Sequence, residues 1–232
     1  MRIEPELSSV SIVMLGNFNP SIFQPFWLQK HGLISEQAAQ SAKVAVIHPE
    51  ISSFSIDTEF IFTMQRDRFL AVRSVAPFVT AADMCSRIFG DLLPHTPIHQ
   101  LGINRAVHFS VGSWQERNRI GDILVPKEPW GIWGEGFKST DKSKLGGLQS
   151  MTMVNKQAPD REAGYVMAKI EPSKAIGNGE TGIFMEVNDH YQFADPSKVT
   201  DPMPIVSILQ TRFDASIALS ESVIDQIMSL KT

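Results

Sequence analysis

The amino-acid sequence predicts an α+β fold in which antiparallel sheets carry helices on one face. Alternating apolar and polar residues from Ser53 to Gln65, and apolar runs bounded by turn residues elsewhere, are typical of strands. Apolar stripes of period 3.6 at residues 79–93 and 205–228 indicate amphipathic helices. The expected strands and helices follow one another in a similar order in residues 1–94 and in residues 95–232. This order predicts two α+β halves packed as one body. We expect a pseudo-twofold duplication of a β-α-β-β-β-α unit, with one unsymmetrical α+β domain as the alternative.

The first half has seven expected elements. They are a strand at 10–15, a helix from 20 to 32, a helical turn at 35–39, strands at 44–47, 53–65 and 69–75, and a helix at 79–93. Asn19 and Ser35 can each accept a hydrogen bond from the first free amides of a helix, which predicts a helix start after each. Continuous alternation from Ser53 to Gln65 predicts one strand, and Arg66 with Asp67 a hairpin tip after it.

The second half repeats this order. Its expected elements are a strand at 98–111, a helix at 114–124, strands at 149–155, 164–170 and 182–188, and a closing helical segment at 205–228. Ser113 caps the first helix and Pro126 ends it. Glycines at 176–182 favour a hairpin loop, and Ser220 with its neighbours indicates a break in the last helix.

Composition excludes several classes of protein. With 232 residues, of which 43% are hydrophobic, the chain can bury a core. Twenty-one Lys and Arg against 25 Asp and Glu argue against nucleic acid or an anionic membrane as a partner over the whole surface. A single cysteine forms neither an internal disulfide nor a Cys-rich zinc site, so we expect a cytoplasmic protein. No apolar stretch approaches the roughly 18 residues of a membrane span.

Residues that could carry chemistry form no recognisable set. The motifs of a nucleophile elbow, a zinc protease, a P-loop and a dinucleotide site are all absent from the sequence. Pro97 separates His95 from His99, so the two cannot form a metal pair on one helix face. Cys85 occupies an inward position of its helix, where a thiol packs as a small hydrophobic residue. We therefore expect no catalytic residue, no metal and no cofactor.

Two histidines stand near carboxylates in the sequence, His48 near Glu50 and His190 beside Asp189. Neighbouring residues on an extended chain point to opposite faces, which favours ordinary surface histidines. The alternative is an enzyme or small-molecule sensor in which His48, Glu50 or His190 converge in a cleft between the halves.

The connector after the helix at 114–124 is unusual because Trp130, Ile132, Trp133 and Phe137 stand there among glycines, ahead of several lysines. Connectors of roughly 20 residues without secondary structure are often functional, and tryptophans are frequent anchors of protein interfaces. These four residues therefore form a candidate recognition loop for a protein partner. In the alternative interpretation, Trp130 and Trp133 fold back over the sheet and close an edge or the core.

The uncovered face of the sheet suggests two further partners. If that face is apolar, it would dock a second copy of the chain, and the ten methionines would suit such an adaptable interface. We therefore expect a homo-oligomer. Nucleic-acid binding through the same face would require a basic stripe, for which the lysines after Phe137 are too few.

The central part of the chain carries a resemblance to a known family. Residues 92–98 read Leu-Leu-Pro-His-Thr-Pro-Ile and residues 101–104 read Leu-Gly-Ile-Asn, between a capped helix and a long strand. Here the chain resembles a sporadically distributed family of uncharacterised bacterial proteins of similar length. The family has no established activity, so the resemblance assigns no functional residue, but its patchy distribution implies a defence-type system. The expected function is a non-catalytic protein-binding or assembly subunit.

Overall fold

The computed structural model of the protein describes residues 4–57, 59–137, 146–157 and 163–231. Its centre is one nine-stranded sheet with the order β2-β3-β4-β5-β1-β6-β9-β8-β7, and every neighbouring pair is antiparallel. The strands are β1 (Leu7–Gly16), β2 (Lys43–His48), β3 (Ile51–Ile56), β4 (Phe60–Gln65), β5 (Arg68–Arg73), β6 (Ile98–Ser110), β7 (Met151–Asn155), β8 (Ala163–Pro172) and β9 (Gly182–Gln192).

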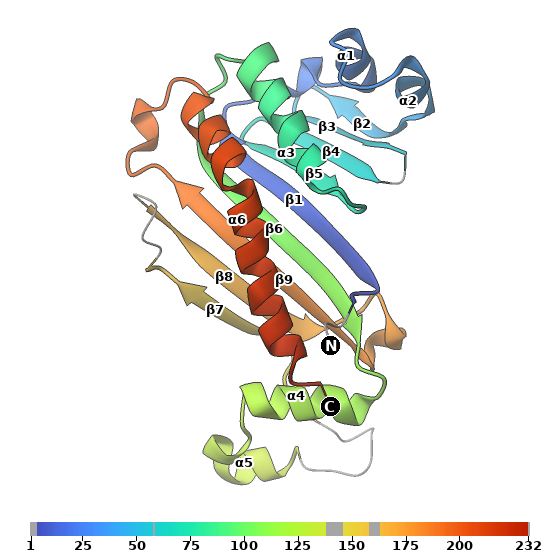
Figure 1. The fold of residues 1–232 in the computed structure, drawn as a ribbon, viewed down its shortest axis with the longest axis vertical. Helices are drawn as coiled ribbons and strands as arrows, with labels where there is room; N and C mark the ends of the chain where they lie inside the picture. Colours follow the sequence, from blue (N-terminus) through green and yellow to red (C-terminus); the bar gives the residue numbers. More distant parts are fainter. Residues whose placement is uncertain (1–3, 58, 138–145, 158–162, 232) are drawn as a thin grey trace.

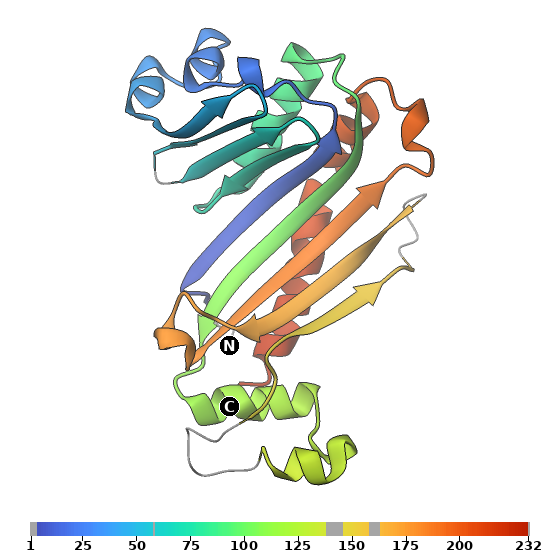
Figure 2. The same ribbon diagram turned by 180° about the vertical axis from the view of Figure 1, so that it is seen from behind.

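The described α-helices cover one face of this sheet or lie beyond its end (Figure 1). They are α1 (Pro25–Lys30), α2 (Glu36–Ser41), α3 (Val79–Ser86), α4 (Trp114–Leu124), α5 (Gly131–Glu135) and α6 (Met203–Met228). Figure 1 shows α3 and the long α6 lying across the sheet, with α4 and α5 beyond one end of it. Figure 2 shows the opposite face of β1, β6, β9 and β8, over which no described helix lies. The predicted fold class, an α+β protein with an antiparallel sheet and helices on one face, is confirmed.

The strand order has an internal correspondence about the central pair β1 and β6. In each half the first strand pairs with the last, β1 with β5 and β6 with β9, and a meander continues outward from there. The first meander contains four strands where the sequence predicted three. The pairing of β1 with β6 carries the sheet without interruption across the boundary expected at residue 94. Duplication of one unit remains a prediction that this topology favours.

The core has two parts on the covered face. The larger lies beneath α3 and the first half of α6 and is rich in phenylalanine; Phe69 and Phe89 meet there edge to face with ring centroids 4.9 Å apart. The smaller lies between the end of α6 and strands β6, β8 and β9. Because α6 supplies Phe213 to the first part and Ile224 to the second, this one helix joins both.

Several elements differ from the sequence prediction. The strand expected at 53–65 is two strands, β3 and β4, and Asp57 between them has a positive φ of 53°. The helix expected from Pro20 is a 3-10 turn, η1 (Pro20–Ile22), followed by α1, which begins at Pro25 because proline suits a first helical turn. The break expected near Ser220 is absent, since Ser220 Oγ donates to the carbonyl of Ser216 within a continuous α6.

Across the described residues, the structure contains no helix with both the length and the apolar character that a membrane crossing requires.

Candidate protein-binding surface

The segment singled out by the sequence lies beyond α4. Ser113 Oγ accepts a 3.1 Å hydrogen bond from the amide of Glu116 and starts α4, as expected of a helix cap. The described part of the connector that follows contains a 3-10 turn, η3 (Glu128–Trp130), and α5. Residues 138–145, with the lysines noted in the sequence, lie outside the described residues. The predicted loop is therefore corrected to a short helical unit at the end of the molecule (Figure 1).

Two glycines explain how α5 fits against the chain before it. Gly131 has a φ of 57°, a left-handed conformation that glycine adopts without steric cost, and it turns η3 into α5. Gly134 is buried, and a Cβ there would lie 2.2 Å from the carbonyl oxygen of Lys127. Lys127 Nζ in turn forms a 3.0 Å ion pair with Asp122 of α4. The close contact at Gly134 and this ion pair hold α5 beside α4.

The aromatic residues of this unit pack on one another and leave much of their area exposed. The ring centroids of Trp130 and Trp133 are 5.3 Å apart, and Trp133 meets Phe137 edge to face at 4.4 Å. Trp130 is 51% exposed, Trp133 63% and Ile132 93%. Neither tryptophan belongs to the two core clusters. We call Trp130, Ile132, Trp133 and Phe137 the aromatic surface.

A hollow of about 220 Å³ adjoins the aromatic surface. Its lining is mostly apolar and comes from α4, from the aromatic surface and from the chain that leads into β7: Asp122, Val125, Lys127, Trp130, Trp133, Phe137, Gly147, Leu148, Ser150 and Met151. Gly146 packs on the ring of Phe137, where a Cβ would come within 2.4 Å of a ring carbon. The indoles thus form one wall of a pre-shaped depression that an apolar side chain can enter.

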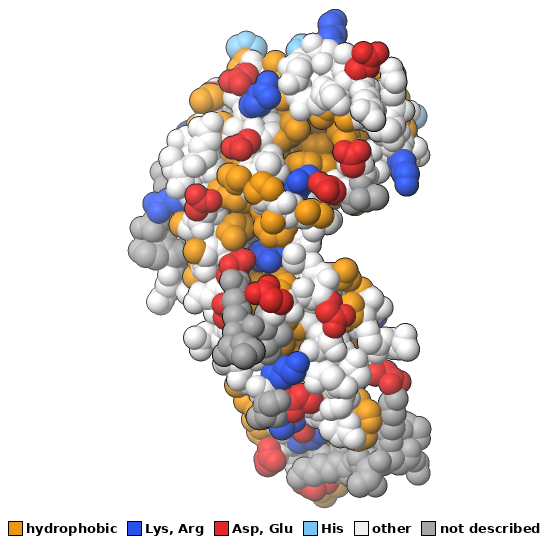
Figure 3. All heavy atoms as spheres, turned by 45° about the vertical axis from the view of Figure 1, so that its right-hand side comes forward, with side chains coloured by type: hydrophobic (Ala, Val, Ile, Leu, Met, Phe, Trp, Pro, Cys, Tyr) orange, Lys and Arg blue, Asp and Glu red, His pale blue; other side chains and the backbone are white. Residues whose placement is uncertain are grey.

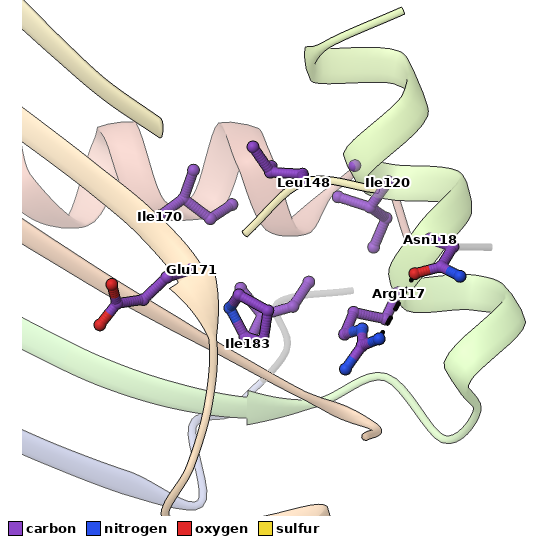
Figure 4. Close-up of a pocket in the computed structure, with 9 residues that line it drawn as sticks. Arg117, Asn118, Ile120, Leu148, Ile170, Glu171 and Ile183 are labelled. Carbon is purple, nitrogen blue, oxygen red and sulfur yellow. Dashed lines mark hydrogen bonds between the residues drawn. The ribbon is translucent and has the colours of Figure 1, made fainter. Parts of the chain in front are cut away.

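A second pocket nearby is too small for a ligand. It lies between α4 and the ends of β8 and β9, where Ile120, Leu148, Ile170 and Ile183 converge (Figure 4). Its volume is about 20 Å³, room for about one water molecule. Arg117, at its rim, donates a 2.7 Å hydrogen bond to the carbonyl of Gly179, and burial lowers the pKa of this guanidinium. The side chains around this pocket pack α4 against the ends of β8 and β9.

Charged side chains form no basic stripe on the face seen in Figure 3. There, Lys and Arg of the described residues are interspersed with Asp and Glu, while hydrophobic side chains gather around the helices in the upper part. On the uncovered sheet face the hollow over the central strands includes Arg68 and Glu186, one charge of each sign. Among the described residues, neither the face in Figure 3 nor the lining of this hollow contains a basic stripe of the kind that nucleic-acid binding uses.

The other residues considered in the sequence lie apart. Cys85 is fully buried in the larger core, and burial raises the pKa of its thiol well above the ordinary value. His48 and Glu50 lie at the β2–β3 turn, where Glu50 pairs with Arg66 at 2.6 Å. His190 lies on β9 near the middle of the sheet. His190 therefore lies apart from His48 and Glu50, and the structure does not bring the three residues together in one cleft. Within the described ranges, no group of three metal-ligating side chains occurs.

Sequence reasoning missed the contact between the half-buried His108 and the buried Ser173. His108 Nδ1 and Ser173 Oγ are 2.7 Å apart, and Ser173 is fully buried. Ser173 Oγ also accepts from the amides of Ala175 and Ile176, so the hydroxyl organises the turn after β8. Because Ser173 is enclosed and its oxygen is fully engaged, the pair stabilises the turn and does not resemble an exposed nucleophile. The 65-residue separation gave no signal in the sequence.

Comparison with known proteins found no matching family model and no matching curated protein.

Proposed function

We propose that this chain is a non-catalytic binding or assembly subunit that holds a protein partner through the aromatic surface. The partner is another protein or a second copy of the chain. The proposal rests on the side chains at the end of the molecule rather than on the fold, because one fold serves many functions.

The exposure of Ile132 between two half-exposed tryptophans carries the proposal. Ile132 is 93% exposed, so its side chain adds almost no hydrophobic stabilisation to the folded state. Trp130 and Trp133 leave 51% and 63% of their surface in water. Contiguous apolar areas of this kind are typical of interaction sites, and buried tryptophans dominate the binding energy of many interfaces. The adjoining hollow of about 220 Å³ offers a partner's apolar side chain a place to bury.

The rigidity of the unit favours the same interpretation. Gly134 lets α5 pack closely against the backbone of Lys127. Trp130 contacts Trp133, and Trp133 contacts Phe137. Side chains that are already ordered lose less conformational entropy on binding, so more of the contact energy appears as affinity. A partner would meet a surface that needs little rearrangement.

The experiment is quantitative capture by the full tagged chain from native extract, together with sedimentation velocity for self-association. The Trp130→Ala/Trp133→Ala variant is compared with wild type and with Phe26→Ala. Phe26 is a matched control because it is 63% exposed on α1, at the opposite end of the molecule (Figure 1). We expect the double variant to lose the partner, or the dimer, while Phe26→Ala retains it. Equal recovery with all three proteins would remove the aromatic surface from the proposal.

A further inference from the structure

The uncovered face of the sheet contains a hollow of about 410 Å³ at its centre. It lies over β5, β1, β6, β9 and β8, on the side that faces the reader in Figure 2. Cavities of this size fall within the range of small-molecule sites. The hollow shares no lining residue with the aromatic surface or with the depression beside it.

Gly102 accounts for the depth of the hollow. It lies on β6 directly across from Val13 of β1 and His190 of β9, in the middle of the sheet. A Cβ at this position would lie 3.4 Å from Asn188 Oδ1 and 3.6 Å from Asn104 Nδ2. Its backbone φ lies outside the left-handed range, so the conformation itself does not require glycine. The absent side chain leaves bare backbone as the floor, with two carboxamides beside it.

Three carboxamides form the polar side of the hollow. Asn104 is 6% exposed and donates a 3.3 Å hydrogen bond to the carbonyl of Ser11, and Gln100 Oε1 lies 3.2 Å from His190 Nε2. Asn188 Oδ1 is buried and has no hydrogen-bond partner within the described residues. A buried acceptor without a partner costs free energy, so a ligand donor that met Asn188 Oδ1 after rotation of this side chain toward the hollow would be bound favourably.

The other residues that line the hollow indicate the size, charge and shape of ligand that it can bind. Tyr165 stacks on His190 with centroids 4.5 Å apart and planes 15° from parallel, which fixes the imidazole. Val13, Leu15 and Leu70 supply an aliphatic side on β1 and β5. Arg68 and Glu186 contribute one charge of each sign, and no cationic cluster is present among the lining residues. The hollow therefore suits an uncharged, flat molecule with polar edges.

We propose that this hollow binds a nucleobase-type heterocycle, as the free base or the nucleoside. Carboxamides offer a donor and an acceptor side by side, which is how Asn and Gln pair with the edge of a base. The aliphatic side chains can pack on the plane of the ring while Asn104 and Asn188 address its edge. The balanced charge of the lining provides no specific site for phosphate groups, so phosphorylation of the ligand should not strengthen binding.

The test is isothermal titration calorimetry of the full chain with adenosine, guanosine, cytidine and uridine, and with the free base and 5′-monophosphate of each. Glucose serves as a polar ligand without a flat base. We expect at least one base or nucleoside to bind, its monophosphate to bind no more tightly, and glucose not to bind. Absence of binding by every base and nucleoside, each titrated to its solubility or to about 10 mM, a free energy near 3 kcal/mol, would overturn the proposal.

Variants then locate the site. Gly102→Val fills the floor on an extended strand where valine is well tolerated, and Asn188→Ala removes the unpartnered acceptor. We expect each to weaken binding by about tenfold or more, Gly102→Val because its side chain occupies the space of the ligand and Asn188→Ala because a buried polar contact is lost. His48→Ala, at the distant β2–β3 turn, should leave it unchanged. Thermal melts verify folding, and if Gly102→Val does not fold, Asn188→Ala decides. Binding that survives in the folded variants would contradict the assignment.

Discussion

Asp189 on β9 accepts a 2.6 Å hydrogen bond from Ser216 Oγ on α6. Both residues are almost completely buried, and Tyr191 Oη donates to the same carboxylate oxygen at 3.0 Å. A carboxylate in an apolar layer is tolerated only when it is hydrogen-bonded, so this contact fixes where α6 crosses the sheet. It lies between the two core clusters that α6 joins.

Ser216→Ala should destabilise the protein because it removes a donor from a buried carboxylate. We expect a loss of about 2 kcal/mol in the free energy of unfolding, measured by urea denaturation. Ser207→Ala is the matched control, since Ser207 is exposed on the same helix, and it should change stability by less than about 0.5 kcal/mol. Equal effects of the two substitutions would show that the Asp189 contact does not anchor α6.

The His108 contact should make stability depend on pH. Burial lowers the pKa of His108 below 6.5, so the folded state holds the neutral ring that contacts Ser173. Below 6.5 the unfolded chain binds the proton more readily, and this stabilising contribution is lost as the pH falls through the folded-state pKa. His108→Gln, which does not titrate, should show a smaller loss of stability between about pH 7.5 and pH 5 than wild type. Parallel pH profiles would contradict this assignment.

Glu186 should have the opposite effect on the pH dependence of stability. Its pKa is raised above 4.5, first by burial and then by Glu171, while Lys169 opposes the shift. The folded state therefore favours the protonated acid, and the stability it contributes below 4.5 is lost as the pH rises through the folded-state pKa. Glu186→Gln should raise the melting temperature at pH 7, with the gain vanishing near pH 4. The exposed Glu128→Gln is the control. A constant gain at every pH would exclude titration as its cause.

Gly134→Ala should disrupt the aromatic surface without unfolding the core. The new methyl group would lie 2.2 Å from the backbone oxygen of Lys127, so α5 must move away from α4. We expect partner binding to fall, with tryptophan fluorescence altered and the main unfolding transition within about 1 kcal/mol of wild type. Gly90→Ala is the control, because its methyl group would meet only Val206 at 3.5 Å. Unchanged binding by Gly134→Ala would mean that the position of α5 does not matter.

The sequence predicted correctly those helices and strands that depend on neighbouring residues, such as a helix cap or a regular spacing of apolar side chains. The Ser113 cap, the apolar stripe of α3 and the long β6 all follow from side-chain spacing that is visible in the sequence. The single strand expected at 53–65 was wrong because the inward residues Phe54 and Phe60 keep the same parity across the turn at Asp57. Alternation alone cannot reveal a turn that preserves it.

The aromatic surface and the hollow at Gly102 depend on contacts between distant residues, which the spacing of residue types in the sequence does not reveal. Three glycines around Trp133 lower helix propensity, yet α5 forms because Gly134 packs on Lys127. The sequence identified the four residues of the aromatic surface as unusual, but the exposure of Trp130, Ile132 and Trp133 emerged only from the packing of α5. The hollow at Gly102 requires the register of β6 with β9, which brings Asn104 beside Asn188 from 84 residues away.

Hydroxyl-radical footprinting of the four tryptophans tests the central claim most directly. The captured complex, or the dimer, is compared with the isolated chain, and Trp27 and Trp114 serve as internal controls outside the aromatic surface. Our account predicts that oxidation of Trp130 and Trp133 falls several-fold in the complex while that of Trp27 and Trp114 does not change. Equal oxidation of Trp130 and Trp133 in the free and the bound chain would contradict it.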